Sequence, residues 1–251
     1  MIELSAILIV KNESADIERC LNSLLNFADE IIILDSGSTD NTIEICQNYT
    51  QHIFITDWPG FGPQKNRALE KASGKWVLSI DADEWVPEAL KKEIQDIIQK
   101  NNSYSAFSIP RISYYCGCLI RHGDWRNDRP VRLFERGKAK FSNDLVHESL
   151  QVEGKIGGLK QKLKHNAFRS SEEVLEKMNL YSTLWAKNRF KKGVKASLIQ
   201  ALTHSLWTFI RGYFLRAGFL DGKAGFMLAI SNAQGCYFRY IKLMQLYDEI
   251  S

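Results

Sequence analysis

At residues 75–87 the chain reads Lys75-Trp76-Val77-Leu78-Ser79-Ile80-Asp81-Ala82-Asp83-Glu84-Trp85-Val86-Pro87. The apolar run at 76–80 is typical of a buried strand, and the carboxylates of Asp81, Asp83 and Glu84 follow it directly. Carboxylate oxygens gathered at a strand end suit Mg²⁺ or Mn²⁺, which usually keep coordination positions open for phosphate oxygens. A solvated acidic turn before a helix would give the same pattern. The segments that precede the stretch favour the metal site.

Short apolar runs alternate with helical periodicity through the first hundred residues. The runs expected as strands are residues 5–10, 31–34, 52–56 and 76–80. This alternation predicts an α/β domain with a mostly parallel sheet and helices on both faces. Ligands bind such sheets at the carboxyl ends of the strands, where strand order reverses. Polar clusters follow three of these runs, at residues 12–13, 35–40 and 81–84, so we expect them to form one site.

The helical rhythm stops near residue 104, and short strand-like segments with polar turns follow. They are residues 107–111, 131–135, 138–141, 146–152 and 158–165, and they predict an antiparallel extension of the sheet. His147 and His165 lie in this region. A histidine in such a place is more often an ordinary hydrogen-bonded residue than a ligand.

Residues after 170 are predicted to be helical, with Ser170 or Ser171 as the N-cap. We therefore expect one domain at residues 1–170 and a helical extension at residues 171–251. From Lys177 to the end there are 11 Lys and Arg against 3 Asp and Glu, a net charge of +8, so residues 1–176 carry −4. This asymmetry indicates an anionic partner for the extension.

Aromatic residues interleave with Arg211 and Arg216 between residues 198 and 219. The pattern is typical of an amphipathic helix in a membrane interface, although a helical pair packed on the main domain would also explain it. No nucleic-acid-binding module accompanies the positive charge, so we expect no nucleic-acid partner. No stretch of 18 apolar residues free of charge is present, which argues against a spanning helix.

The remaining sequence features exclude several classes of protein. The five cysteines form no C-x-x-C pair, which favours a reducing compartment and argues against a structural zinc site. The start of the chain lacks the features of a signal peptide. Neither a G-x-G-x-x-G motif nor a P-loop is present, so neither a dinucleotide-dependent dehydrogenase nor a P-loop NTPase is indicated.

Four motifs in order resemble those of the family 2 glycosyltransferases of the GT-A fold. They are Lys11-Asn12-Glu13, Asp35-Ser36-Gly37-Ser38-Thr39-Asp40-Asn41-Thr42, Gly62-Pro63-Gln64-Lys65-Asn66-Arg67-Ala68 and Asp81-Ala82-Asp83-Glu84. Shorter matches in the second half resemble the branch of lipopolysaccharide core glucosyltransferases. Those matches are Val146-His147-Glu148, Lys164-His165 and the segment 213–222. The resemblance implies a GT-A domain with helices on both faces of a mixed sheet, plus a C-terminal helical extension.

The resemblance also implies roles for individual residues. The nucleotide-sugar pocket would include Asn12, Glu13, Asp35, Ser36, Gly37, Ser38, Lys65, Asn66, Arg67, Asp81 and Ala82. Asp35 would meet the uracil ring, and Asp83 would bind the Mg²⁺ or Mn²⁺ that bridges the two phosphates. His165 would add a further metal ligand. Lys65 and Arg67 would contact phosphate or else be surface charges of their helix.

An inverting transfer needs a carboxylate that takes the proton from the acceptor hydroxyl. Glu148 is the expected base and Asp128 is its competitor. The expected reaction moves a hexose, glucose by resemblance, from a UDP-sugar donor to the inner core of lipopolysaccharide. The alternatives are another lipid-linked or capsular glycan acceptor, or a nucleotide-sugar-binding scaffold without catalysis. We expect the protein in the cytoplasm, peripheral on the anionic inner face of the bacterial inner membrane; the sequence does not predict its oligomeric state.

Overall fold

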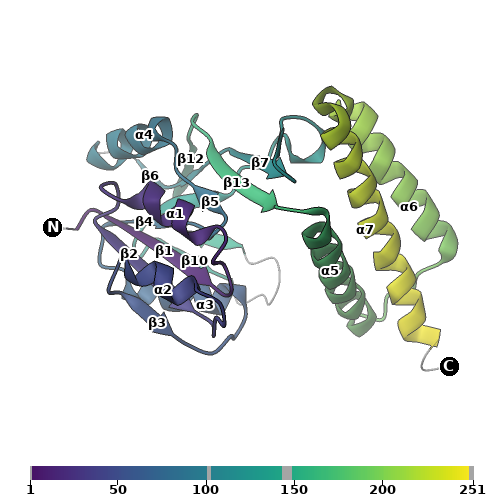
Figure 1. Cartoon of the computed structure of the whole chain (residues 1–251), viewed down its shortest axis with the longest axis horizontal. Coiled ribbons are helices and arrows are strands. Elements are labelled where there is room, and N and C mark those ends of the chain that lie inside the picture. Colours follow the sequence, from purple (N-terminus) through teal and green to yellow (C-terminus); the bar gives the residue numbers. More distant parts are fainter. Residues whose placement is uncertain (1, 101–102, 143–148, 249–251) are drawn as a thin grey trace. The chain divides into compact units, whose positions relative to one another are not determined.

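A computed structural model describes residues 2–100, 103–142 and 149–248 of the chain (Figure 1). The chain forms two compact units. The first unit comprises Met1–Arg111 and Asp128–His165, and the second comprises Ile112–Asn127 and Asn166–Ser251. This grouping differs from the expected division at residue 170 because residues 112–127 join the C-terminal helices.

A seven-stranded sheet forms the centre of the first unit. Its order is β12 (Lys155–Gly158), β6 (Tyr104–Ser108), β9 (Val131–Glu135), β4 (Trp76–Ser79), β1 (Leu4–Val10), β2 (Glu30–Asp35) and β3 (Ile53–Ile55). Strands β4, β1, β2 and β3 are parallel, whereas β9 runs antiparallel between β4 and β6. Strand order reverses at β1, whose neighbours are β2 and β4. The expected α/β class is confirmed; of the expected antiparallel extension, β9 pairs antiparallel with its two neighbours, whereas β12 joins β6 in parallel.

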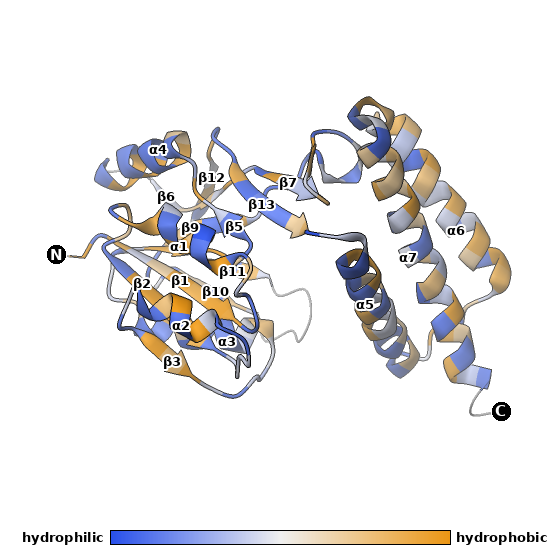
Figure 2. Ribbon diagram, in the orientation of Figure 1, coloured by the Kyte–Doolittle hydropathy of each residue, from blue (hydrophilic) through white to orange (hydrophobic). Residues whose placement is uncertain are grey.

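Helices cover both faces of this sheet. They are α1 (Ile17–Leu24), α2 (Thr42–Gln47), α3 (Phe61–Lys71) and α4 (Glu88–Gln99). Alternate residues of β1 supply two cores: Leu8 packs with α1 and α4 residues on one face, and Ile7 packs with Ala68 of α3 on the other. Period-two alternation places successive side chains on opposite faces, and both faces of β1 are apolar because both are covered. Figure 2 shows hydrophobic residues along β1, whereas hydrophobic and hydrophilic residues alternate along α4.

Two further strand pairings involve residues of the first unit. Strand β5 (Glu84–Trp85) pairs antiparallel with β13 (Leu163–Phe168), and His165 lies opposite Glu84 in the register. Strand β10 (Ala139–Phe141) pairs antiparallel with β11 (Leu150–Val152). The β5–β13 pair connects the end of the Asp81–Glu84 motif to a late segment of the chain.

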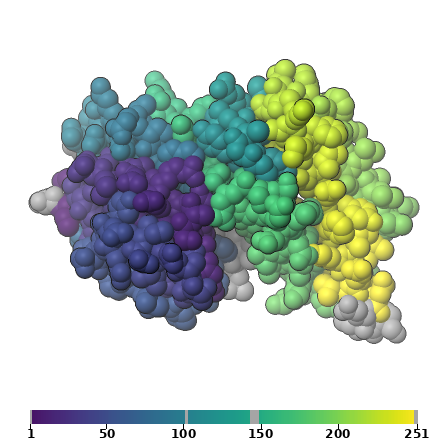
Figure 3. Space-filling model, in the orientation of Figure 1, coloured from purple at the N-terminus to yellow at the C-terminus, as the bar shows by residue number. Residues whose placement is uncertain are grey.

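The second unit is mostly helical. It contains the end of β7 (Arg111–Tyr115), then β8 (Cys118–Ile120), η1 (Gly123–Trp125), α5 (Ser171–Lys191), α6 (Leu198–Ile210), the π-helical turn η2 (Arg211–Leu215), η3 (Gly218–Asp221) and α7 (Gly222–Asp248). Ser170 caps α5 by accepting a hydrogen bond from the Glu173 N–H, as predicted. Helix α7 packs against α5 and α6, and it forms part of the surface of this unit in Figure 3. Among the residues described, no helix is both long and apolar enough to cross a bilayer.

Candidate active site

The carboxyl ends of β1, β2 and β4 bring the three predicted polar clusters to one edge of the sheet. The Ser36 N–H donates to the Val10 carbonyl at 3.0 Å, and the Ile80 N–H donates to the Ile7 carbonyl at 3.1 Å. The loops that follow these strands therefore start side by side. They start where strand order reverses, which is the usual ligand position in such sheets.

The loops after β1 and β2 are joined by a set of hydrogen bonds. The Asn12 N–H donates to Ser38 Oγ at 2.9 Å, and Asn12 Oδ1 accepts from the Thr39 N–H at 2.7 Å. Asn12 has φ of +56°, a left-handed conformation that asparagine tolerates better than most residues. The Glu13 N–H donates to Thr42 Oγ1 at 2.7 Å. Asn12 and Glu13 thus fix the relative position of the two loops that were predicted to line the nucleotide pocket.

Asp35 is fully buried and closes its own loop. Its Oδ2 accepts from the N–H groups of Gly37 at 2.8 Å and Ser38 at 2.9 Å, and its Oδ1 accepts from the Ser38 hydroxyl. Ser36 Oγ accepts from Gln64 Nε2 of α3 at 3.0 Å. The contact between Asp35 and a uracil ring stays a prediction, and the loop hydrogen bonds occupy the same carboxylate oxygens.

A network of charges follows β4. Asp81 pairs with Lys65 Nζ at 3.2 Å and with Arg132 of β9. Glu84 Oε1 accepts from Arg132 at 2.7 Å and from Arg111 at 2.8 Å, and its Oε2 accepts from the Asp81 N–H at 3.0 Å. Glu84 is completely buried, so its carboxylate holds the motif in shape.

Electrostatics keep Asp81 ionised. Burial would favour its neutral form, but the positive charges of Arg132 and Lys65 outweigh burial and hold the pKa of Asp81 well below its usual range. Burial likewise disfavours the charged form of Arg132, but Asp81 and Glu84 raise the pKa of its guanidinium above the ordinary arginine value. The site therefore presents a fixed carboxylate among fixed cations.

Asp83 and His165, the two predicted metal ligands, are neighbours. His165 Nε2 lies 3.4 Å from Asp83 Oδ2, and both side chains are partly exposed, at 14% and 23%. The pairing of β5 with β13 produces this proximity. The described part of the chain contains no cluster of three or more His, Cys, Asp or Glu suited to a metal. A divalent ion at this pair would take its other ligands from phosphate oxygens and water, as Mg²⁺ commonly does.

The other predicted residues have separate environments. Asn66 forms two hydrogen bonds with the Phe141 backbone of β10, each 2.9 Å long. Arg67 pairs with the exposed Asp57 at 2.7 Å. Ala82 is buried between Asp81 and Asp83.

Of the two candidate bases, Asp128 is held by an arginine. Asp128 lies 2.6 Å from Arg111 in an ion pair and accepts a second bond from Arg111 Nε at 2.7 Å. This two-point contact fixes the orientation of the Asp128 carboxylate. Glu148 lies outside the described residues.

Sequence reasoning missed Arg111 and Arg132, which organise the carboxylates. Each arginine has an uncharged residue on either side: Pro110 and Ile112 flank Arg111, and Val131 and Leu133 flank Arg132. Arg132 stands between apolar residues in β9 and is 6% exposed. A single charge inside an apolar strand implies a buried partner, because isolated buried charges are too costly. That signal could have identified Arg132.

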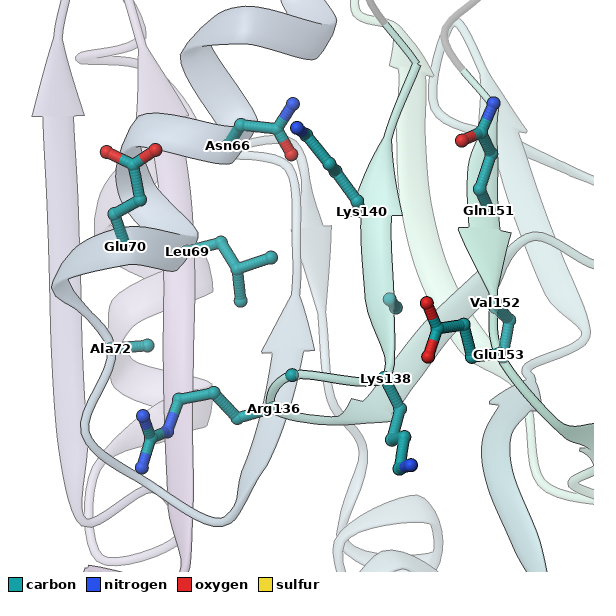
Figure 4. A pocket seen from close by; sticks show the side chains of 12 residues that line it. Asn66, Leu69, Glu70, Ala72, Arg136, Lys138, Lys140, Gln151, Val152 and Glu153 are labelled. Atoms are coloured by element: carbon teal, nitrogen blue, oxygen red, sulfur yellow. The ribbon is translucent and has the colours of Figure 1, made fainter.

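Figure 4 shows a cavity of about 580 Å³ elsewhere in the first unit. It lies between α3 and the strands β10 and β11, and its wall includes Arg136, Lys138, Lys140 and Glu153. Of the predicted site residues that the structure describes, Asn66 is the one in its lining. The motif residues gather at the strand edge, so we place the candidate active site there and not in this cavity.

The profile of the family described as "Glycosyl transferase family 2" matches residues 5–148, more than half of the chain. The chain belongs to this family. The match covers the three strand-end clusters, and together with the mixed sheet covered on both faces it confirms the predicted GT-A fold. The C-terminal helices extend this fold beyond the matched residues.

Relatives extend the similarity over nearly the whole chain. An uncharacterized glycosyltransferase of Rickettsia prowazekii (strain Madrid E) is 33% identical, over 99% of this chain and 88% of the relative. The lipopolysaccharide core biosynthesis glycosyltransferase LpsC of Rhizobium meliloti (strain 1021) is 31% identical, over 96% and 92%. Among solved structures, S. aureus TarS 1-349 in complex with UDP is 18% identical, over 99% and 92%, with a TM-score of 0.49.

Proposed function

We propose that this glycosyltransferase is a metal-dependent hexosyltransferase that uses a UDP-sugar, with glucose as the expected sugar, and inverts the anomeric centre. The observation that supports it best is the 3.4 Å approach of His165 to Asp83, next to the ion-paired Asp81. One carboxylate and one imidazole, both partly exposed, can take a divalent cation and leave positions for a diphosphate. These two residues fit the implied Mg²⁺ or Mn²⁺.

A bound divalent ion would supply charge stabilisation for the departing nucleoside diphosphate. The protein's part is to hold Asp83 and His165 together through the β5–β13 pairing and to keep Asp81 ionised. Lys65 is 5% exposed and fixed next to Asp81, where its ammonium can add positive charge for a phosphate.

The proton of the acceptor hydroxyl goes to Glu148 in this proposal, with Asp128 as the alternative base. The double contact with Arg111 engages Asp128 Oδ2 and fixes the orientation of this carboxylate, which leaves it less free to meet an acceptor hydroxyl. We expect Glu148→Gln to abolish transfer and Asp128→Asn to retain part of it. The opposite result would assign the base to Asp128.

The proposed acceptor is the inner core of lipopolysaccharide or another lipid-linked or capsular glycan. The relative LpsC, whose printed name refers to lipopolysaccharide core biosynthesis, supports the first choice. A chain that reaches a membrane-anchored acceptor must approach the bilayer surface, so we propose peripheral association with the anionic cytoplasmic leaflet. The net charge of +8 from residue 177 onward supports this location.

The test measures thermal stabilisation by UDP-sugars with and without Mn²⁺. We expect one UDP-sugar to stabilise the wild type in a Mn²⁺-dependent way, of the size that mass action gives for its affinity. Asp83→Asn should remove the Mn²⁺ dependence, and His165→Ala should weaken Mn²⁺ affinity by at least roughly tenfold.

His52→Ala is the matched control, because His52 is an exposed histidine at the start of β3. It should behave as the wild type. Unchanged Mn²⁺ affinity in both Asp83→Asn and His165→Ala would reject the metal site. Absence of stabilisation by every UDP-sugar would reject the proposed donor.

A further inference from the structure

Five aromatic rings gather on the second unit, where α6 leads into η2, η3 and the start of α7. Tyr213 is at their centre: its ring centroid lies 5.4 Å from Phe209, 5.1 Å from Phe214, 6.3 Å from Phe219 and 5.5 Å from Phe226. We call these five residues the aromatic patch. Phe214, Phe219 and Phe226 are 55%, 48% and 45% exposed.

Other exposed apolar residues lie beside the patch in sequence. The exposed large side chains next to the patch in sequence are Leu206, Trp207, Leu215, Leu220 and Met227. Exposed apolar residues are normal when scattered, but a contiguous set rimmed by polar groups indicates an interaction site. The patch is therefore a candidate interaction surface.

The backbone beneath the patch is fixed by glycine contacts. A Cβ on Gly225 would lie 1.9 Å from the Gly218 carbonyl oxygen, and a Cβ on Gly218 would lie 2.7 Å from the Gly212 carbonyl oxygen. Only glycine permits such close approach of η2, η3 and α7. Ala217, between the two turns, has φ of +57°. The turns that carry Phe214 and Phe219 are thus held in one irregular conformation.

Ionic contacts on the same turns hold them to the segment 121–124. Asp124 accepts from Arg211 at 3.1 Å and from Arg216 at 2.6 Å. Asp221 accepts from the His122 N–H and from His122 Nδ1, each at 2.8 Å. Both arginines nevertheless remain more than a third exposed, at 38% and 41% of their side chains. Positive charge therefore lies beside the patch.

We propose that the aromatic patch is a membrane-docking surface that inserts among the headgroups of a bilayer containing anionic lipid. Tyrosine and phenylalanine side chains suit the interfacial depth of a bilayer, and nearby cations suit anionic headgroups. A second copy of the chain fits less well, because paired copies would bring Arg211, Arg216 and the exposed Lys223 close to their own equivalents. The inference rests on the proposed function in one respect, that the acceptor is anchored in a membrane.

The test uses the full chain and vesicles of phosphatidylcholine with or without phosphatidylglycerol, in about 0.1 M salt, where screening acts over roughly 10 Å. Co-sedimentation gives the partition coefficient. The double variant Phe214→Ser with Leu215→Ser should lose at least roughly tenfold in partition to the anionic vesicles. The matched control is Leu175→Ser with Leu180→Ser on α5, where the two leucines are 56% and 53% exposed. It should stay within about twofold of wild type, since each substitution there removes a similar apolar area far from the aromatic patch in sequence.

Two further readouts separate the possible results. Light scattering without vesicles reports oligomeric state: a dimer that the patch variant converts to monomer, with vesicle partition unchanged, would overturn the proposal. Equal loss of partition in patch and control variants would also overturn it. Thermal stabilisation by UDP-sugar is measured on the same samples. Vesicle binding that depends on the patch, without donor binding, would support the membrane-docking surface and reject the proposed function. Donor binding without vesicle binding would support the proposed function and reject the membrane-docking surface.

Discussion

The buried pair of Arg132 and Glu84 is the most sensitive contact of the candidate site. Their side chains are 7% and 0% exposed. Removing one partner of a buried ion pair leaves the other charge without compensation. For Glu84, Arg111 still supplies one positive charge when Arg132 is removed. We therefore expect Arg132→Met to lower the unfolding free energy by about 3 kcal/mol. Urea denaturation at pH 7 measures it. The matched control Arg67→Met breaks the exposed pair with Asp57 and should shift the midpoint little. Equal shifts would contradict the structural role of Arg132.

Asp81 predicts a specific response to acid. Its native pKa lies below the unfolded value of about 3.9, so its contribution to stability is complete above that pH and is lost as pH falls toward the native pKa. We expect the unfolding free energy of the wild type to fall as pH drops below about 4. Asp81→Asn should show a shallower fall, measured by urea denaturation at several pH values. Asp96→Asn, on the exposed side of α4, is the control. If the unfolding free energy of Asp81→Asn falls with pH as steeply as that of the wild type, the ionic role of Asp81 is rejected.

Within helix α7, Gly225 and Gly235 differ in how closely other atoms approach them. A Cβ on Gly225 would meet the Gly218 carbonyl oxygen at 1.9 Å, whereas one on Gly235 would meet Met178 Cγ at an ordinary 3.5 Å. Gly225→Ala should therefore destabilise the second unit by about 1–3 kcal/mol through overpacking. Gly235→Ala should be neutral or stabilising by up to about 1 kcal/mol, because alanine favours helices. Thermal melts of both variants measure the difference, and equal melting temperatures would contradict the close packing at Gly225.

The strands and the polar clusters that follow them could be predicted from the sequence, but several long-range pairings could not. The strand at 76–80 and the clusters after β1, β2 and β4 follow from local apolar runs and from the rule for parallel sheets, and both are confirmed. The interaction of Arg132 with Asp81 and Glu84 could not be derived in this way, because it depends on β4 pairing antiparallel with β9, a strand that lies far from it in sequence. The grouping of residues 112–127 with the C-terminal helices likewise depends on long-range contacts of Asp124 and Asp221. Local patterns specify elements, whereas pairings distant in sequence specify the surroundings of each charge.

Over the whole molecule, charge and apolar surface are divided along the chain. Residues 1–176 carry −4 and the rest carry +8, and the aromatic patch belongs to the positive part. A chain that binds a bilayer through one part and sugar nucleotide through another gains rate by raising the local concentration of a membrane-anchored acceptor. This gain depends on surface binding and leaves the chemical step unaltered.

A variant that no longer binds the bilayer should therefore change the KM for a membrane-embedded acceptor but not the KM for the same glycan in solution. For acceptor embedded in anionic vesicles, Phe214→Ser with Leu215→Ser should raise the apparent KM by about the factor lost in vesicle partition. For the deacylated glycan in solution, the same variant should keep the wild-type KM, because neither residue belongs to the strand-edge site. Initial rates of UDP release measure both. Raising salt from about 0.1 to 0.5 M should weaken only the vesicle reaction, since screening shortens the reach of the basic residues. A matching loss on the deacylated glycan would instead place the aromatic patch in the transfer reaction itself.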